Sequence, residues 1–283
     1  MTFLALLTKE LRLRLRRERT IWVVIAYIFL MGLLGWFYIS RASMSNYGGY
    51  DIGQLGKQLY YLLSVVQLFL ILFITPAFTA TSVNGEKERQ TFDLLLCSKL
   101  SAFSLVSGKL VAGLVNAFLL IAASVPLFSL VFFFGGVAPS QVLLGSLVFI
   151  ITAIMVGTFG LLCSTFLARP AVSTAVTYLL SVLWVIAPVV VTYIILAVRN
   201  SNGSTQESLY VWNPVVALLS TYPDGSSFVV GSQHIPIWLT YSLISIVATT
   251  VFFFVSVYVV KPNPRLRSPR QPRTKATQPL TVS

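Results

Sequence analysis

The chain has 283 residues, of which 56% are hydrophobic and only 10% are charged. So few charges cannot cover the surface of a soluble globular protein, which indicates an integral membrane protein. The formal net charge of +12 would suggest nucleic-acid binding in a soluble protein, but here the basic residues stand beside apolar runs, where they orient a protein in the membrane. Nucleic acid is therefore not an expected partner, whereas membrane lipid is.

The first segment, residues 1–19, carries six basic residues ahead of the first long apolar run. Its leucines recur at helical spacing, at Leu4, Leu7, Leu11 and Leu15. This pattern predicts an N-terminal amphipathic helix that lies in the membrane interface. The alternating residues 11–16 also fit a strand, but no partner strand is visible, so a helix is the favoured interpretation.

Six uncharged runs are each long enough to cross a bilayer as a helix, which takes about 20 residues. The predicted spans cover residues 20–40, 59–80, 110–134, 141–168, 171–198 and 236–260. Residues 135–140, G-G-V-A-P-S, supply the turn between the third and fourth spans. Gly157 and Gly160 in the fourth span would permit close helix packing. No charged residue lies inside a predicted span, which argues against a proton relay or an ion-coupled carrier.

Residues 83–109, between the second and third spans, hold the densest cluster of mixed charge in the chain. Apolar side chains of this segment fall on one face of a helix, namely Phe92, Leu95, Leu96 and Leu100. This spacing predicts a short amphipathic helix. We expect Asn84 to cap its start, and Glu86 and Glu88 to lie in its first turn, where carboxylates favour the positive end of the helix dipole.

Residues 200–235 form the longest predicted loop, and residues 209–220 within it, L-Y-V-W-N-P-V-V-A-L-L-S, are apolar but too short to cross a membrane. Such a segment is either interfacial or re-entrant. Because Asn213-Pro214 interrupts it near the middle, we expect two short helical pieces. The backbone groups that the break frees should be satisfied by protein or by water in a cavity.

The distribution of basic residues predicts the orientation. With the N-terminus in the cytoplasm, 17 of the 20 Lys and Arg lie inside, and only Arg41, Lys57 and Arg199 lie outside. The positive-inside rule therefore places both termini and residues 83–109 in the cytoplasm. Residues 261–283, with five prolines and six basic residues, are expected to form a disordered cytoplasmic tail after a permease domain that spans residues 1–260.

No catalytic motif is visible in the sequence. Gly108-Lys109 is followed by Leu110 and lacks the upstream glycine of a phosphate-binding loop. The single histidine, His234, has no companion ligands, and the two cysteines, Cys97 and Cys163, are too few for a disulfide framework or a metal site. We therefore expect the chain not to be an enzyme and to bind no cofactor or metal itself.

The charged segment, S-V-N-G-E-K-E-R-Q-T-F-D-L-L-L-C-S-K-L-S followed by S-G-K-L-V-A-G-L, resembles the signature of bacterial ABC exporter permeases of the second export type. The positions that match the signature are Glu86, Glu88, Arg89, Thr91, Leu95, Leu96, Ser101, Gly108 and Lys109. The sequence departs from it at Gln90, where glycine is usual, and at Lys99, where proline is usual. The resemblance covers roughly residues 1–260.

The resemblance implies an all-α polytopic membrane protein with six transmembrane helices, located in the plasma membrane and working as a homodimer or with a paralogous permease. A separate ABC ATPase subunit, which binds ATP and Mg, would dock on the cytoplasmic face. The residues that would form the coupling helix are Glu86, Lys87, Glu88, Arg89, Gln90, Thr91, Phe92, Asp93, Leu95 and Leu96. Its apolar face would anchor in the ATPase and its charges would set its orientation. A solvated interfacial loop without a partner is the alternative.

By the same resemblance, the apolar segment before the last span would form an external gate. The gate residues would be Tyr210, Trp212, Asn213 and Pro214. An interfacial helix that lies flat is the alternative, and the aromatic side chains suit either. For the whole chain the alternatives to an exporter permease are a channel or carrier without an ATPase, and a membrane assembly or immunity factor that uses the same fold.

Overall fold

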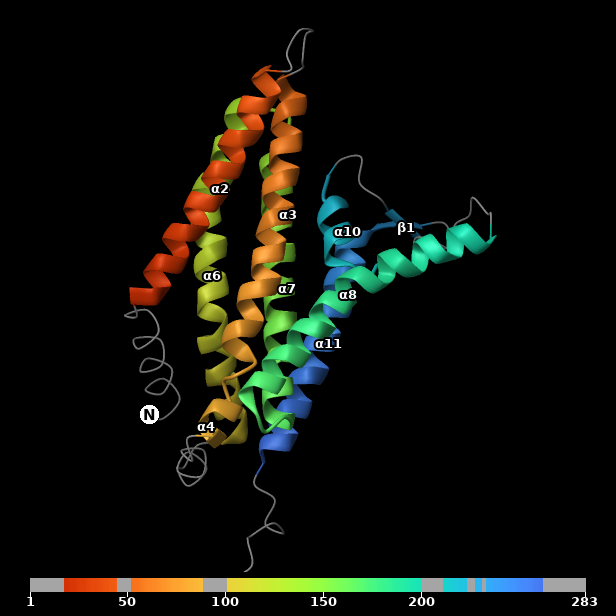
Figure 1. The fold of residues 1–283 in the computed structure, drawn as a ribbon. Helices are drawn as coiled ribbons and strands as arrows, with labels where there is room; N and C mark the ends of the chain where they lie inside the picture. The colour runs from red at the N-terminus through yellow and green to blue at the C-terminus, as the bar shows by residue number, and fades with distance from the viewer. Residues whose placement is uncertain are drawn as a thin grey trace, which may run out of the picture.

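The computed structural model describes residues 18–44, 52–88, 101–199, 211–222, 227–230 and 233–261. Within these ranges six helices are long and apolar enough to cross a membrane. They are α2 (Glu18–Met44), α3 (Ile52–Thr79), α6 (Ala102–Phe134), α7 (Pro139–Phe166), α8 (Pro170–Arg199) and α11 (Ile237–Val260). Each coincides with one predicted span, so the polytopic helical architecture is confirmed (Figure 1).

Two predicted parts of the chain fall largely outside this description. The expected interfacial helix over residues 1–19 precedes the described part of the chain, apart from the start of α2. The expected cytoplasmic tail lies beyond residue 261, where the description ends. Both remain predictions from the sequence.

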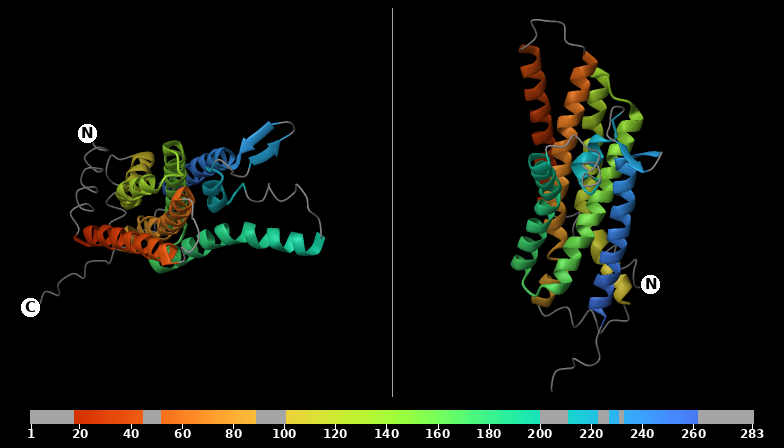
Figure 2. Two further views of the ribbon diagram at one scale, coloured as in Figure 1. Left: turned by 90° about the horizontal axis from the view of Figure 1, so that it is seen from above. Right: turned by 90° about the vertical axis from the view of Figure 1, so that its right-hand side faces the viewer.

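Helices α3, α6 and α7 form the centre of the bundle. Helix α3 packs against α6 and α7, while α2 packs against α3 and α6 on one side and α11 packs against α7 on the other (Figure 2). Side chains such as Leu68, Ile71, Val106, Ala117 and Leu161 are completely or almost completely buried between these helices. The central helices therefore supply most of the packed interior on which the peripheral helices rest.

Glycines allow the central helices to approach closely, as predicted for the fourth span. A Cβ atom added to Gly160 of α7 would lie 2.4 Å from Thr79 Oγ1, and one added to Gly113 of α6 would lie 2.6 Å from Thr79 Cγ2. A Cβ atom on Gly157 would lie 2.6 Å from Leu114 Cδ2. The end of α3 is thus enclosed by α6 and α7, at a spacing that only small residues permit.

The predicted turn joins α6 to α7. Gly135 and Gly136 adopt φ angles of 75° and 80°, which side chains with a Cβ rarely allow. A Cβ atom on Gly136 would also lie 2.0 Å from Gly53 O at the start of α3. The side chain of Gln141 accepts a hydrogen bond of 2.9 Å from the amide of Ala138 and so helps to begin α7. The turn is therefore determined both by backbone conformation and by packing.

A short helix and a β-hairpin lie between α8 and α11. Helix α10 spans Pro214–Leu219, and strands β1 (Ser227–Val230) and β2 (Gln233–Pro236) pair in antiparallel register, with Val230 opposite Gln233. The hairpin departs from the all-helical expectation. Its sequence signal is the dipeptide Gly231-Ser232 between two short runs, which is typical of a two-residue hairpin loop.

Helix α8 is, with α2, one of the two least enclosed spanning helices among the described residues. Figure 1 shows that it begins beside the ends of α3 and α7 and then runs outward, away from the other helices. It carries large exposed apolar side chains along its length, namely Leu179, Val182, Leu183, Ile186, Val190 and Ile194. A surface of this kind must contact either lipid or another protein in the membrane.

Candidate coupling site

The segment that follows α3 is fastened to several neighbouring helices. Residues 80–83 form turns, and α4 (Asn84–Glu88) follows immediately. We call residues 80–88 the post-α3 segment, and the end of the bundle that carries it the α4 end (Figure 1). Figure 1 also places the first turn of α8 and the last turn of α7 at this end.

A serine of α7 caps the beginning of α4. The backbone amides of Val83 and Asn84 donate hydrogen bonds of 2.9 and 3.1 Å to Ser164 Oγ. The first amides of a helix have no partner within the helix, and an oxygen supplied from elsewhere satisfies them. Ser164 therefore ties the start of α4 to the last turn of α7.

The expected capping role of Asn84 is wrong. The residue is completely buried, and neither side-chain polar atom of Asn84 has a hydrogen-bond partner among the described residues. The residue type commonly caps a helix by accepting from an amide two or three residues later, but the amides of Glu86 and Lys87 both donate to the carbonyl of Val83. The amides at the start of α4 are therefore satisfied by the Val83 carbonyl and the Ser164 hydroxyl, not by the Asn84 side chain.

The end of α3 is also connected to α8. The hydroxyl of Ser173, in the first turn of α8, donates a hydrogen bond of 2.7 Å to the carbonyl of Ala80. Both residues are completely buried. A buried carbonyl without a partner is costly, so this contact fixes the position of α8 relative to the post-α3 segment.

A buried ion pair connects the post-α3 segment to α6. Lys109 Nζ lies 2.6 Å from Glu86 Oε1 and also donates a hydrogen bond of 2.8 Å to the carbonyl of Ser82. The lysine is only 3% exposed. A charge removed from water in this way is tolerated only when it is paired and hydrogen-bonded. The structure thus joins two residues that match the exporter signature at opposite ends of the charged segment.

The location of Lys109 corrects the prediction that no charge lies inside a span. Helix α6 begins at Ala102, where Ser101 Oγ accepts a hydrogen bond from the amide of Ser104, whereas the span was predicted to begin at Leu110. Hydropathy ends a predicted span at the first charge, whereas the helix continues past Lys109, and Glu86 pairs with that charge from another segment. Lys109 therefore belongs to the site, although the predicted coupling helix did not include it.

Lys87 makes the contact farthest along the post-α3 segment. Its ammonium group donates a hydrogen bond of 2.9 Å to the carbonyl of Thr165, near the end of α7. Cations favour the negative end of a helix dipole, and this carbonyl lies in the last turn of α7. Lys87 and Ser164 together hold α4 against that turn.

Three of the predicted coupling residues lie in α4, namely Glu86, Lys87 and Glu88. The other predicted coupling residues lie outside the described part of the chain, namely Arg89, Gln90, Thr91, Phe92, Asp93, Leu95 and Leu96. The amphipathic helix that they would form stays a prediction. What the structure adds is the attachment of its first residues to α6 and α7, through Glu86 and Lys87.

The segment predicted to form a gate packs against α3, α7 and α11, in the half of the bundle away from α4 (Figure 1). Asn213 is completely buried: its Nδ2 donates a hydrogen bond of 2.9 Å to the carbonyl of Val185 in α8, and its Oδ1 accepts one of 2.8 Å from the amide of Val215. Leu218 is 1% exposed, and α10 packs against α3, α7 and α11. A protein group thus satisfies the backbone amide of Val215, as expected for this segment.

The expectation of two helical pieces is not met within residues 211–222, which contain one helix. Asn213 and Pro214 do not interrupt a helix but begin one, because asparagine caps the first turn and proline suits the first helical position. Trp212 precedes the cap and is 53% exposed. Tyr210 lies just before the described range.

Comparison with known families agrees with this architecture. The family model of ABC-2 family transporter proteins matches residues 4–261, which is nearly the whole chain. The chain belongs to the ABC-2 transporter family. A search among curated proteins gives no match.

Membership in the ABC-2 family has consequences for the role of the chain. It is a multi-pass membrane component of an ABC transporter, and the family works with an ABC ATPase. The recognised exporter-permease signature is thereby confirmed at the level of the family. The post-α3 segment carries part of that signature, at Glu86 and Glu88.

Proposed function

We propose that this chain is the permease subunit of an ATP-driven exporter, which moves its substrate outward with energy from ATP hydrolysed in a separate ATPase subunit. ATP and Mg bind in that partner, and this chain holds neither. The observation that carries the proposal is the attachment of the post-α3 segment to α6, α7 and α8 through Lys109, Ser164 and Ser173. A force on this segment would reach three membrane helices directly.

The proposed coupling works through rigid contacts rather than through a flexible loop. The ion pair between Glu86 and Lys109 is mostly withdrawn from solvent, and the amides of Val83 and Asn84 are held by one hydroxyl. A displaced α4 would therefore carry α6 and α7 along with it, because breaking these buried contacts costs more than moving the helices together. The coupling helix itself would extend from α4 into residues 89–96, with Phe92 as its apolar anchor.

A dimer is part of the proposal, with either a second copy or a paralogous permease. The exposed apolar side chains of α8 and its outward course leave a helix that few contacts hold to its own bundle. Helix packing in membranes depends on close van der Waals contact. A partner permease packed along α8 would supply such contacts and would place a translocation path between the two halves.

The gate proposal concerns Trp212 and α10. Trp212 lines a cavity of about 300 Å³ between α7, α8 and α11, together with Trp184, Phe159 and Phe252. Asn213 ties the beginning of α10 to α8. A movement of α8 would therefore move the indole at the edge of this cavity, which is the behaviour required of an external gate.

The central test of the proposed function uses the chain in complex with whichever ABC ATPase co-purifies with it in detergent. Reconstituted into vesicles, the complex is expected to hydrolyse ATP and to transport, whereas the chain alone hydrolyses none. Transport by the chain alone down a gradient, with no dependence on ATP, would instead establish a channel or carrier. The ATPase subunit also gives an independent readout, because a Lys109→Met variant should uncouple hydrolysis from transport.

The gate is tested separately with cysteine pairs that join Trp212 to its counterpart across the dimer axis. Crosslinking is expected to stop export while leaving ATP hydrolysis measurable. If the pair never crosslinks, or if crosslinking leaves export unchanged, α10 is a structural helix without a gating role.

A further inference from the structure

Helix α3 carries buried polar groups that have no partner in this arrangement of the helices. Gln67 is completely buried and Thr75 is 1% exposed. Tyr27 Oη of α2 donates a hydrogen bond to Gln67 Oε1, but Gln67 Nε2 and Thr75 Oγ1 have no hydrogen-bond partner within the described part of the chain. Unpaired polar groups inside a membrane protein are costly. The position of α3 in the structure therefore leaves hydrogen bonds unmade.

A further unpaired group lies on α6 at the level of Thr75. Asn116 is 5% exposed, and its Oδ1 accepts no hydrogen bond from a described residue. A Cβ atom on Gly113 of α6 would lie 2.6 Å from Thr79 Cγ2 of α3, so these two residues are adjacent. Because the two helices run antiparallel, one turn back along α3 and one turn forward along α6 lead from this contact to Thr75 and Asn116. A hydroxyl that can donate thus lies level with an amide oxygen that can accept.

Pro76 divides α3 into a long body, residues 52–75, and a short end that leads into the post-α3 segment. A proline inside a helix supplies no amide to the helix and weakens it at that point. Before the proline, the carbonyl of Phe73 accepts a hydrogen bond of 2.6 Å from Tyr178 Oη. After it, the carbonyl of Ala80 accepts one of 2.7 Å from Ser173 Oγ. Helix α8 therefore holds α3 on both sides of its weak point, so a movement of α8 acts on the bend.

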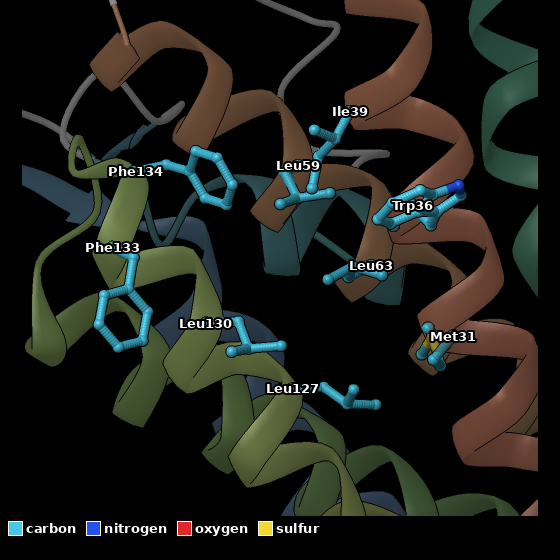
Figure 3. Close-up of a pocket in the computed structure, with 11 residues that line it drawn as sticks. Met31, Trp36, Ile39, Leu59, Leu63, Leu127, Leu130, Phe133 and Phe134 are labelled. Carbon is cyan, nitrogen blue, oxygen red and sulfur yellow. The ribbon is translucent and has the colours of Figure 1, made fainter.

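A second cavity lies beside the body of α3 and gives it room to move. The cavity has a volume of about 370 Å³ and lies between α2, α3 and α6, with Leu59 and Leu63 of α3 in its wall. Figure 3 shows Leu127 and Leu130 of α6 on one side of it and Met31 of α2 on the other. No charged side chain lines it. A shift of α3 toward this space would replace an empty volume with contacts between apolar side chains.

We propose that α3 bends at Pro76 during the transport cycle, so that its body closes this cavity and Thr75 donates a hydrogen bond to Asn116. Leu63 lies about 20 Å from Pro76 along the helix, so a change of bend of about 10° displaces Leu63 by roughly 3 Å. Thr75 immediately precedes the proline, where a change of bend turns the side chain. The proposal rests on the proposed exporter function, because the transport cycle is what alternates α3 between the two arrangements.

The polar pair is tested with Thr75→Val and Asn116→Leu in the complex with the co-purifying ATPase. An apolar replacement for an unpaired buried group costs little or stabilises, so neither variant should unfold at a lower temperature than the wild type. ATP-driven transport in vesicles should fall about fivefold, as for the loss of one hydrogen bond in the second arrangement, and the double variant should fall no further. Thr158→Val is the control, because that hydroxyl donates to the carbonyl of Ile154 within α7, and it should transport like the wild type.

The space is tested with Gly35→Leu. A Cβ atom added to Gly35 of α2 would meet only Leu59 Cδ1, at 3.9 Å, so the larger side chain fits into the cavity. It should lower transport while the unfolding temperature stays equal or rises, because it occupies the volume that α3 needs. Ala26→Leu, an enlargement at an exposed position of α2 outside the cavity, is the matched control and should transport like the wild type.

The proposal is overturned if Thr75→Val or Asn116→Leu unfolds at a lower temperature, because the replaced group would then be hydrogen-bonded in the arrangement that the structure shows. It is equally overturned if these variants, or Gly35→Leu, transport like the wild type. A wild type without ATP-driven transport would remove the proposed exporter function, and this proposal with it. A transporting wild type with equally active variants would remove only the bending of α3.

Discussion

Lys109 of α6 and Glu86 of α4 form an ion pair of 2.6 Å in which the lysine side chain is only 4% exposed and the glutamate side chain 26%. The lysine also donates to the carbonyl of Ser82, so it bridges two points of the same segment. Both charged groups stand at the α4 end, where α3 leads into the charged segment. The pair is the strongest single link between the candidate coupling site and the membrane helices.

Removing one partner of this pair should destabilise the protein. Lys109→Met removes the cation that lies 2.6 Å from Glu86, and breaking a pair whose lysine is buried is expected to cost about 3 kcal/mol. A lower unfolding temperature in detergent is the measurement, with Lys261→Met, an exposed lysine at the end of α11, as the control. The double variant Lys109→Met, Glu86→Gln should recover part of the loss, and no recovery would mean that the two groups do not act as a pair.

Ser164→Ala should loosen the post-α3 segment. The substitution leaves the amides of Val83 and Asn84 without their acceptor, which should cost about 2 kcal/mol. Hydrogen exchange of these two amides should accelerate relative to the wild type. Ser146→Ala is the matched control, because the hydroxyl of Ser146 bonds within its own helix to Leu143 O, and equal exchange in both variants would contradict the capping role.

Gly160→Ala should disturb the contact between α7 and the end of α3. The added Cβ would lie 2.4 Å from Thr79 Oγ1, and overpacking of this kind costs about 1–3 kcal/mol. Removing the obstructing hydroxyl in Gly160→Ala, Thr79→Ala should restore much of the unfolding temperature. The close approach is not a constraint on stability if the single variant unfolds at the wild-type temperature.

The last residue of α4 and the residues beyond it should be needed for coupling but not for membrane insertion. Phe92→Ala combined with Glu88→Ala is expected to reduce ATP-driven transport, because a well-packed apolar anchor at an interface contributes on the order of 2 kcal/mol. Surface expression and unfolding temperature should stay near wild type. Normal export by this double variant would remove the coupling assignment.

The orientation follows from the charge bias and is tested by cysteine labelling. In a background without Cys97 and Cys163, a cysteine at position 90 should react with a membrane-impermeant reagent only after the cells are opened, whereas one at position 138, exposed just before α7, should react in intact cells. The positive-inside rule predicts this pattern. Labelling of position 90 from outside would invert the topology.

The apolar lengths of the spans and the Gly135-Gly136 turn could be read from the sequence because they depend on local properties. A run of uncharged residues crosses a bilayer as a helix whatever its neighbours are, since its backbone must satisfy itself in lipid. Paired glycines likewise mark a turn without reference to the rest of the fold. The hairpin on either side of Gly231-Ser232 also depends on local sequence, although the prediction of a loop over residues 200–235 did not include it.

The connections of the candidate site depended on the tertiary structure. Ser164 and Lys109 are distant in sequence from the groups that they contact in the post-α3 segment, and nothing in local hydropathy indicates that Ser164 faces two free amides or that Lys109 faces a glutamate. Such partners are decided by which helices are adjacent and at what depth each side chain lies. Asn84 illustrates the limit: its residue type predicts a cap, but the amides that it would cap, those of Glu86 and Lys87, donate to the carbonyl of Val83, because buried donors bind whichever acceptor the packing brings within reach.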